Sequence, residues 1–296
     1  MKKVMLVINP ASGGEQAESF GKAAVEKLAT SFEHVERRYT EAIGDAKKFA
    51  REAADDHYDS LFVMGGDGTV NEGISGIAEQ GYRPKFGFFP LGTVNDLARA
   101  LGIPLDPKEA IDQLQLDQTQ ALDIGKVNQS YFTNIVAIGN IPASINNVDD
   151  KEKTLLGPMA YVLSGMKEIL GNQTYEFDII TSEDREVVKG SLVLVGLTNS
   201  IGGMDRFTPE AKVDDGFLHL VYTKDQSVTD TLKALPGLFS KESPNDDLLA
   251  YRKIKEATIT VKNASLQTNV DGDPGDNLPV HVSVLPSHIQ VYRCKD

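Results

Sequence analysis

Through residue 101 the chain alternates short strand-like runs with segments of helical periodicity, and this alternation restricts the fold more than any other feature. The strand-like runs lie at 3–9, 35–39, 60–64 and 85–90, and the helical segments lie at 16–31, 44–56, 71–80 and 95–101. The run at 3–9 is almost continuously apolar, which is typical of a strand buried on both faces. Strands that alternate with helices through short connections form a parallel sheet covered by helices. We therefore predict a three-layer, Rossmann-like α/β domain.

The sequence changes character after about residue 116, where helical periodicity becomes scarce. Short runs with β-rich composition follow, separated by turn residues; they lie at 131–138, 176–181, 191–198, 217–223, 258–261 and 280–285. Such a series predicts an antiparallel β-sandwich or barrel. Two segments, 154–170 and 228–239, have apolar residues at helical spacing instead. The length of 296 residues fits two domains, an α/β domain followed by a β domain.

The acidic composition and the single cysteine exclude several classes of protein. With a net charge of −13 the surface repels nucleic-acid phosphates, so we expect no binding to DNA or RNA. Cys294 is the one cysteine, so an internal disulfide is impossible and a reducing compartment is expected. The sequence has no run of eighteen apolar residues that could span a bilayer. We predict a cytoplasmic protein, with peripheral membrane contact as an option.

The strongest chemical signal follows the run at 60–64 and reads Met64-Gly65-Gly66-Asp67-Gly68-Thr69-Val70-Asn71-Glu72. Glycines let backbone N–H groups approach phosphate oxygens closely, and the N-terminus of the following helix favours anions. Asp67 could hold Mg²⁺ directly or through water, and Thr69 could cap the helix or contact phosphate. A lone Gly-Asp-Gly would be a tight turn with an aspartate cap, but the full string in this context predicts a nucleotide site. The chain has no Walker A sequence, so no P-loop lysine takes part.

Two further loops and Thr40 belong to the same predicted edge of the sheet. Residues 9–14 (Asn-Pro-Ala-Ser-Gly-Gly) follow the first strand, residues 90–96 (Pro-Leu-Gly-Thr-Val-Asn-Asp) follow the fourth, and Thr40 ends the second. In a parallel sheet ligands bind beyond the carboxyl ends of the strands, where these glycine, hydroxyl and amide groups converge. Each loop alone would be an ordinary turn, so their joint placement is what supports a ligand site.

These strings resemble the signatures of the diacylglycerol kinase catalytic-domain superfamily, with the bacterial soluble lipid kinases as the most similar subgroup. The resemblance covers nearly the whole chain and is strongest at 9–14, 65–72, 90–99, 122–125, 132–134 and 209–218. Gly-Gly-Asp-Gly-Thr alone is shared with NAD kinases, whereas Asn71 and Glu72 favour the lipid kinases. The resemblance implies an ATP-binding domain of residues 1–118 with 287–296 and a β-sandwich lipid domain of residues 119–286, with the active site between them.

By this resemblance, ATP is the phosphoryl donor, Mg²⁺ is the metal, and the loops at the sheet edge bind the nucleotide. The matching positions are Asn9, Pro10, Ala11, Ser12, Gly13, Thr40, Gly66, Asp67, Gly68, Thr69, Val70, Asn71, Glu72 and Thr93. The family also holds a structural Mg²⁺ in the second domain. That implies ligands from the Asp215 carboxylate and the carbonyls of Lys212 and Phe217, with Asp123 linking the ion towards the active site. From the residues alone, Asp214-Asp215-Gly216 would be a β-turn.

The general base is where the chain departs from the family, whose pattern near the C-terminus is Asp-Gly-Glu. Here the string is Asn269-Val270-Asp271-Gly272-Asp273-Pro274, so Asp273 takes the place of the glutamate. Its carboxylate could accept the proton of the lipid hydroxyl, mainly by orienting the alcohol, because the transition state is loose. Aspartate is shorter by one methylene, and a misplacement of about 1 Å can cost ~10²-fold in rate. The alternative is a strand-end turn with two acidic residues.

The sequence therefore predicts a lipid kinase, with diacylglycerol as the leading substrate and phosphatidic acid as its product. The segment 154–170 either packs on the sandwich core or lines the lipid entrance, near Lys151, Lys153 and Lys167. A NAD kinase is the alternative enzyme. A catalytically weak regulatory protein that binds lipid or nucleotide is the alternative from another class, and a homodimer is left open.

Overall fold

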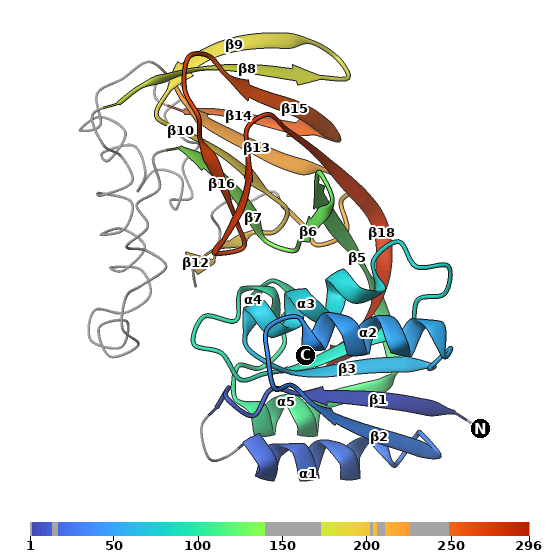
Figure 1. Ribbon diagram of the computed structural model, residues 1–296. Coiled ribbons are helices and arrows are strands. Elements are labelled where there is room, and N and C mark those ends of the chain that lie inside the picture. The colour runs from blue at the N-terminus through green and yellow to red at the C-terminus, as the bar shows by residue number, and fades with distance from the viewer. Residues whose placement is uncertain are drawn as a thin grey trace. The chain divides into compact units, whose positions relative to one another are not determined.

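The computed structural model describes residues 2–13, 17–139, 173–201, 204–205, 211–224 and 249–295 (Figure 1). The chain forms two compact units, a first unit of Met1–Ile124 with Ser287–Asp296 and a second unit of Gly125–Pro286. The domain boundary predicted at residue 118 falls inside strand β5, Leu114–Val127. The segments 154–170 and 228–239, for which the sequence predicts helices, lie outside the described residues.

The first unit contains a parallel sheet with helices on both faces, as predicted. Its strands are β1 Lys3–Ile8, β2 His34–Tyr39, β3 Ser60–Gly65 and β4 Lys85–Pro90, in the order β2-β1-β3-β4. Strand β18, Val280–Cys294, continues that order and pairs in parallel with β4 through Val291 and Phe86. The helices are α1 Ala17–Leu28, α2 Asp45–Asp55, α3 Asp67–Ile77, α4 Asp96–Leu101 and α5 Pro107–Gln113. Helices α2 and α3 cover one face of the sheet, and α1 and α5 cover the other (Figure 1).

Helices α2 and α3 pack closely because small residues line their contact. Helix α2 buries Ala46, Ala50, Ala53 and Ala54. A Cβ atom on Gly76 of α3 would lie 2.5 Å from the Cβ of Ala50, so the contact requires glycine there. Helix α3 begins at Asp67 rather than at the predicted Asn71, because extended Gly66 is its N-cap and the glycine-rich loop supplies its first turn.

The second unit is an antiparallel β-sandwich, which confirms the predicted fold class. One layer contains β9, β8, β15 and the first part of β18, and the other has the order β14-β13-β10-β7-β16-β17. The strands are β6 Ser130–Phe132, β7 Ile135–Gly139, β8 Tyr175–Thr181, β9 Arg185–Gly190, β10 Leu192–Gly196, β11 Ser200–Ile201, β12 Met204–Asp205, β13 Leu218–Thr223, β14 Leu249–Ile254, β15 Glu256–Val261, β16 Gln267–Val270 and β17 Asp273–Asn277. Phe132, Phe177 and Ile259 are fully buried in its core.

The strand predicted at 131–138 is in fact two strands, β6 and β7. The backbone N–H groups of Thr133 and Asn134, between them, donate to the Asp271 carboxylate instead of joining a strand ladder. Strands β5, β14, β16 and β17 and helix α5 have no counterpart in the sequence-based prediction, because their residues lack a clear apolar period.

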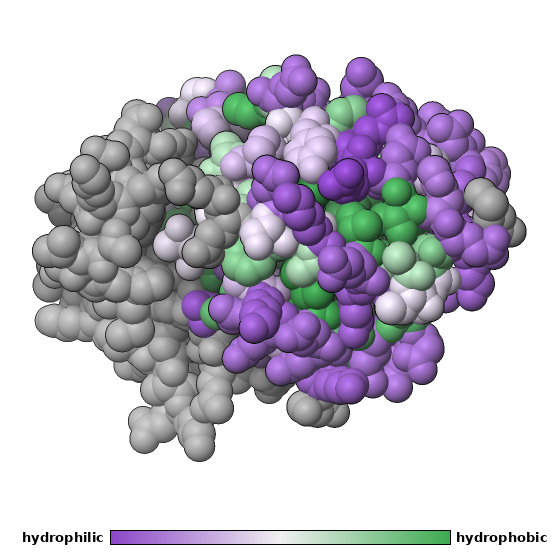
Figure 2. Space-filling view, turned by 90° about the horizontal axis from the view of Figure 1, so that it is seen from below, coloured by the Kyte–Doolittle hydropathy of each residue, from purple (hydrophilic) through white to green (hydrophobic). Residues whose placement is uncertain are grey.

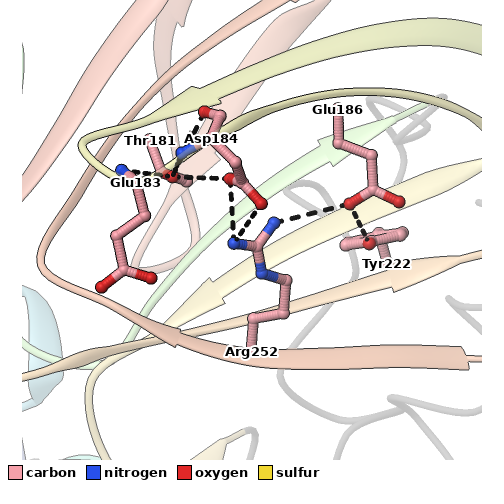
Figure 3. A network of polar contacts seen from close by, with 6 residues as sticks. All are labelled: Thr181, Glu183, Asp184, Glu186, Tyr222 and Arg252. Atoms are coloured by element: carbon pink, nitrogen blue, oxygen red, sulfur yellow. Dashed lines mark hydrogen bonds and ion pairs between the residues drawn. The ribbon is translucent and has the colours of Figure 1, made fainter.

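Arg252 on β14 joins the two layers of the sandwich through a polar network (Figure 3). Its guanidinium donates to Asp184 Oδ1 at 2.9 Å and to Glu186 Oε2 at 3.5 Å. Tyr222 on β13 donates its hydroxyl to the same Glu186 oxygen at 2.6 Å. The hydrogen bond from Arg252 holds the pKa of Asp184 below its usual range. The network therefore fixes the β8–β9 hairpin against β13 and β14.

On the face that Figure 2 shows, the described surface is mainly hydrophilic, and hydrophobic residues gather in limited areas. This agrees with the net charge of −13. None of the helices in the described part of the chain has the length and apolar character that a membrane crossing requires.

Candidate functional site

Asn9 connects the loop after β1 to the first turn of α3 in the first unit. Its Nδ2 donates to Thr69 Oγ1 at 2.9 Å, and its Oδ1 accepts the N–H of Ala11 at 3.0 Å. Its own N–H donates to the carbonyl of Met64 at 2.9 Å, at the end of β3. Asn9 and Thr69, which were assigned to the same site from sequence, thus lie in direct contact.

The glycine loops after β3 and β4 touch through their backbones. A Cβ on Gly92 would lie 2.8 Å from the Cα of Gly66, and a Cβ on Gly65 would lie 2.6 Å from the Cβ of Thr69. A side chain at Gly92 would force the two loops apart, and one at Gly65 would clash with Thr69 in the first turn of α3. The loops after β1, β3 and β4 form a glycine-lined rim at the start of α3. The first N–H groups of a helix have no partner inside it, so a helix start of this kind binds anions readily.

Asp67 holds the loop after β4 in place. Its Oδ2 accepts the N–H of Asn95 and its Oδ1 accepts the N–H of Asp96, both at 2.8 Å. Burial, and next the nearby Asp96 carboxylate, raise the pKa of Asp67. Each carboxylate oxygen has a further lone pair, so these bonds leave room for the predicted contact with a hydrated Mg²⁺. Asn95, which sequence reasoning did not single out, closes the loop by bonding both the N–H and the carbonyl of Gly92.

The other residues assigned to the rim differ in their surroundings. Thr40 is buried, and its N–H donates to the carbonyl of Ile8 at 3.0 Å. Thr93 is exposed. The Oδ1 atom of Asn71 is buried and has no hydrogen-bond partner in the described structure, and its predicted contact with the nucleotide stays a prediction.

The Glu72 carboxylate lies at the N-terminus of helix α2 in the first unit. Its Oε1 accepts the N–H of Gly44, the N-cap of α2, at 2.9 Å, and its Oε2 accepts the N–H of Ala46 at 3.2 Å. The carboxylate therefore caps α2, just after Thr40 and the end of β2. A direct role of Glu72 in binding ATP stays a prediction.

Replacing Glu72 with alanine is expected to lower the free energy of unfolding by about 0.5–2 kcal/mol, because two helix-terminal N–H groups lose their acceptor. Urea denaturation measures this, with Glu41→Ala, an exposed glutamate of the preceding loop, as the matched control. Unchanged stability together with lost ATP binding would instead assign Glu72 directly to the nucleotide.

The second unit holds the carboxylate predicted to bind a structural metal. Asp215 lies in a turn, where its Oδ1 accepts the N–H of Phe217 at 3.1 Å. Its Oδ2 is buried without a hydrogen-bond partner among the described residues, 3.2 Å from the Nε2 of the fully buried His219. Sequence reasoning missed His219, whose Nδ1 lies 2.8 Å from the Tyr251 hydroxyl. A hard cation such as Mg²⁺ prefers oxygen ligands, so this buried carboxylate fits the predicted site, and the carbonyls of Lys212 and Phe217 stay predicted ligands.

The fourth residue of the predicted metal set, Asp123, belongs to the first unit, whereas Lys212, Asp215 and Phe217 belong to the second. Asp123 is buried, and its Oδ1 accepts the N–H of Ser287 at 2.6 Å. The carboxylate therefore binds the backbone of β18 at Ser287, the residue at which this strand enters the first unit.

Asp273, the candidate base, is the first residue of β17 and is exposed. It pairs with Val270 across a two-residue turn formed by Asp271 and Gly272. No hydrogen bond or ion pair to its carboxylate is found within the described ranges, and its role as the base stays a prediction. Asp271 is different, since its carboxylate accepts bonds from Thr133, Asn134 and Ile135. The Asp-Gly pair between two β runs was a signal for this turn that sequence reasoning did not use.

Comparison with known proteins assigns each of the two units to a domain family. Residues 3–127 match the model of the diacylglycerol kinase catalytic domain, and residues 134–293 match the YegS C-terminal NAD kinase beta sandwich-like domain. A diacylglycerol kinase of Staphylococcus epidermidis is 35% identical over the whole of this chain and 93% of its own length. The chain belongs to the diacylglycerol kinase-like family of lipid kinases.

Further relatives agree with this membership. A diacylglycerol kinase of Staphylococcus carnosus is 34% identical to this lipid kinase, over the whole of this chain and 96% of its own length. The crystal structure of a diacylglycerol kinase from Bacillus anthracis superposes with a TM-score of 0.85 at 28% identity, covering 99% of this kinase and 97% of that chain. The similarity includes both units, so it is not limited to the shared glycine-rich loop.

Proposed function

We propose that this kinase transfers the γ-phosphoryl group of ATP to a lipid hydroxyl, with diacylglycerol as acceptor and phosphatidic acid as product. The observation that supports this most is the glycine-lined rim, where the loops after β1, β3 and β4 meet the N-terminus of α3. Backbone N–H groups there bind phosphate oxygens, and Asn71 Oδ1 offers a buried acceptor. When bound, Mg²⁺ neutralises the charge that develops on the transferring phosphoryl group.

Asp67 has two tasks in this proposal. It holds the loop of residues 92–96 through the N–H groups of Asn95 and Asp96, and its remaining lone pairs would hold a hydrated cation. Asp273 accepts the proton of the attacking hydroxyl group and orients that oxygen, since a loose phosphoryl-transfer transition state depends mainly on positioning and charge.

Asp215 is proposed to hold a structural cation, together with the carbonyls of Lys212 and Phe217. Mg²⁺ is then expected to raise the melting temperature in the absence of ATP, since a ligand at 100 times its Kd stabilises a fold by about 2.7 kcal/mol. Asp215→Ala should abolish that rise, whereas Asp214→Ala, which removes the exposed neighbouring carboxylate, should retain it. Thermal unfolding in Mg²⁺ and in EDTA measures both, and an equal rise in the two variants would contradict the site.

Transfer of radiolabelled phosphate from ATP tests the proposed reaction. The labelled product is expected in the phosphatidic acid fraction when diacylglycerol is dispersed in detergent, and in no soluble nucleotide. A parallel reaction with NAD as acceptor covers the alternative that the shared Gly-Gly-Asp-Gly-Thr loop allows. Label in NADP would replace this proposal, and ATP binding without transfer to any component of a total lipid extract would show a binding protein.

A further inference from the structure

Asp273 lies on the β16–β17 hairpin, whose two-residue turn has a well-defined backbone conformation. Asp271 and Gly272 are its two central residues, with φ of +49° and +99°. These left-handed values match the two-residue turn that Asp-Gly sequences favour in β-hairpins. Asn269 Oδ1 accepts the N–H of Gly272 at 3.0 Å and closes the turn from the other side.

Asp271 fastens this turn to the neighbouring strand. Its Oδ2 accepts the N–H of Thr133 at 2.7 Å and the hydroxyl of Thr133 at 3.2 Å. Its Oδ1 accepts the N–H of Asn134 at 3.0 Å and that of Ile135 at 2.8 Å. In return, the N–H of Asp271 donates to the carbonyl of Ile135 at 2.9 Å. One carboxylate thus satisfies three consecutive backbone donors and a hydroxyl.

The same contact fixes the register of the two strands that flank it. Strand β16 pairs with β7 through Val270 and Val136, immediately beyond the bonded N–H groups. Val270 also pairs with Asp273 across the turn. The backbone of Asp273 is therefore placed from two sides, by the turn and by the strand that Asp271 binds. Both oxygens of the Asp271 carboxylate already accept hydrogen bonds, so this carboxylate is not free to accept a bond from a substrate.

We propose that Asp271 is the positioning residue that sets the location of the Asp273 carboxylate for phosphoryl transfer. This rests on the proposed function of Asp273 as the base. The shorter aspartate side chain reaches the substrate hydroxyl only if its backbone is held in one place, and the bonds of Asp271 supply that constraint. Catalysis is sensitive to such placement, because an error of about 1 Å can cost ~10²-fold in rate.

Asp271→Asn tests the proposal, because an amide retains one acceptor oxygen and turns a donor toward the other N–H groups. We expect kcat with diacylglycerol to fall by roughly 10²-fold, while KM for ATP, which binds to the first unit, stays unchanged. The matched control is Asp276→Asn on the same hairpin, an exposed aspartate that accepts one bond from Asn128. The control should keep the wild-type kcat, and equal kcat in both variants would overturn the proposal.

The dependence of kcat on pH distinguishes a positioning role of Asp271 from a purely structural one. Burial raises the pKa of Asp271 to about 6 against the opposing effect of its hydrogen bonds. The residues of β7 and its preceding turn that bond it, Thr133, Asn134 and Ile135, have uncharged side chains, and Asp273 is the nearest carboxylate along its own hairpin. Protonation puts a hydrogen on one oxygen and removes it as an acceptor, so wild-type kcat should fall as the pH drops through about 6.

Thr133→Val gives a second test should Asp271→Asn fail to fold. The variant removes the hydroxyl bond to Asp271, which favours the ionised carboxylate, together with the bond that this hydroxyl accepts from Asn134 Nδ2 at 3.2 Å. The acid limb of kcat should therefore move to higher pH. An acid limb at the same pH in Thr133→Val and wild type would overturn the proposal. Wild-type enzyme that transfers no phosphate to any lipid would instead refute the proposed function itself, which keeps the two failures distinct.

Discussion

Replacing Asp273 with alanine is expected to reduce phosphate transfer to diacylglycerol by about 10²–10⁴-fold, the usual contribution of a positioned general base. The carboxylate is exposed at the start of β17 and has no described partner, so its loss should leave the fold and ATP binding intact. Steady-state kinetics with radiolabelled ATP measure the loss, and calorimetric titration measures ATP binding. Turnover close to wild type would show that another group takes the proton.

The conservative variant Asp273→Glu restores the residue that the family uses at this position. It should retain activity, because the carboxylate remains and only its reach along the side chain changes. A loss as large as that of the alanine variant would mean that the hairpin is built specifically around the shorter side chain. Comparison of kcat for the two variants therefore separates the chemical role of the carboxylate from its placement.

Replacing Asp67 with alanine is expected to remove the ability of the first unit to bind Mg²⁺-ATP, with turnover lowered by at least ~10²-fold through misplaced groups. The variant loses the acceptor that holds the N–H groups of Asn95 and Asp96, so the loop after β4 is released from the glycine loop after β3. Calorimetric titration with ATP and Mg²⁺ measures the loss. Asp56→Ala, an exposed position just past the C-terminus of α2, is the matched control.

We expect the Asp67→Ala variant to lose activity without a corresponding loss of stability. Because burial and the neighbouring Asp96 raise the pKa of Asp67, its ionised form destabilises the folded state as the pH rises through that raised pKa. Alanine removes this charge along with the two hydrogen bonds. A variant that binds Mg²⁺-ATP as wild type does, whatever its melting temperature, would show that the loop is only a turn.

The first unit was predictable from sequence because its signals are local. The buried runs of β1 and β3 and the alanine face of α2 are visible in short windows. The meeting of the loops after β1, β3 and β4 followed from the geometry of parallel sheets. The first turn of α3 was missed, because its glycines favour a loop in isolation, whereas in the structure extended Gly66 is the N-cap and the helix starts at Asp67.

The remaining features depend on contacts between distant residues, which one sequence does not reveal. Glu72 accepts the N–H of Gly44, the N-cap of α2, which is 28 residues away, and Asp271 binds the N–H of Thr133, which is 138 residues away. Strand β17 (Asp-Pro-Gly-Asp-Asn) has no apolar alternation, so its pairing with β16 is what makes it a strand. The resemblance to the lipid kinases located Asp273, yet the fastening of its hairpin by Asp271 became visible only in three dimensions.

The most direct test is a crystal structure of the protein soaked with Mg²⁺ and a non-hydrolysable ATP analogue. The triphosphate should lie against the N–H groups at the start of α3, between the loops of residues 9–13 and 91–93, with the Asn95 loop still bonded to Asp67. A rim that is empty at saturating nucleotide, or nucleotide bound at another place on the chain, would contradict the assignment of this rim as the ATP site.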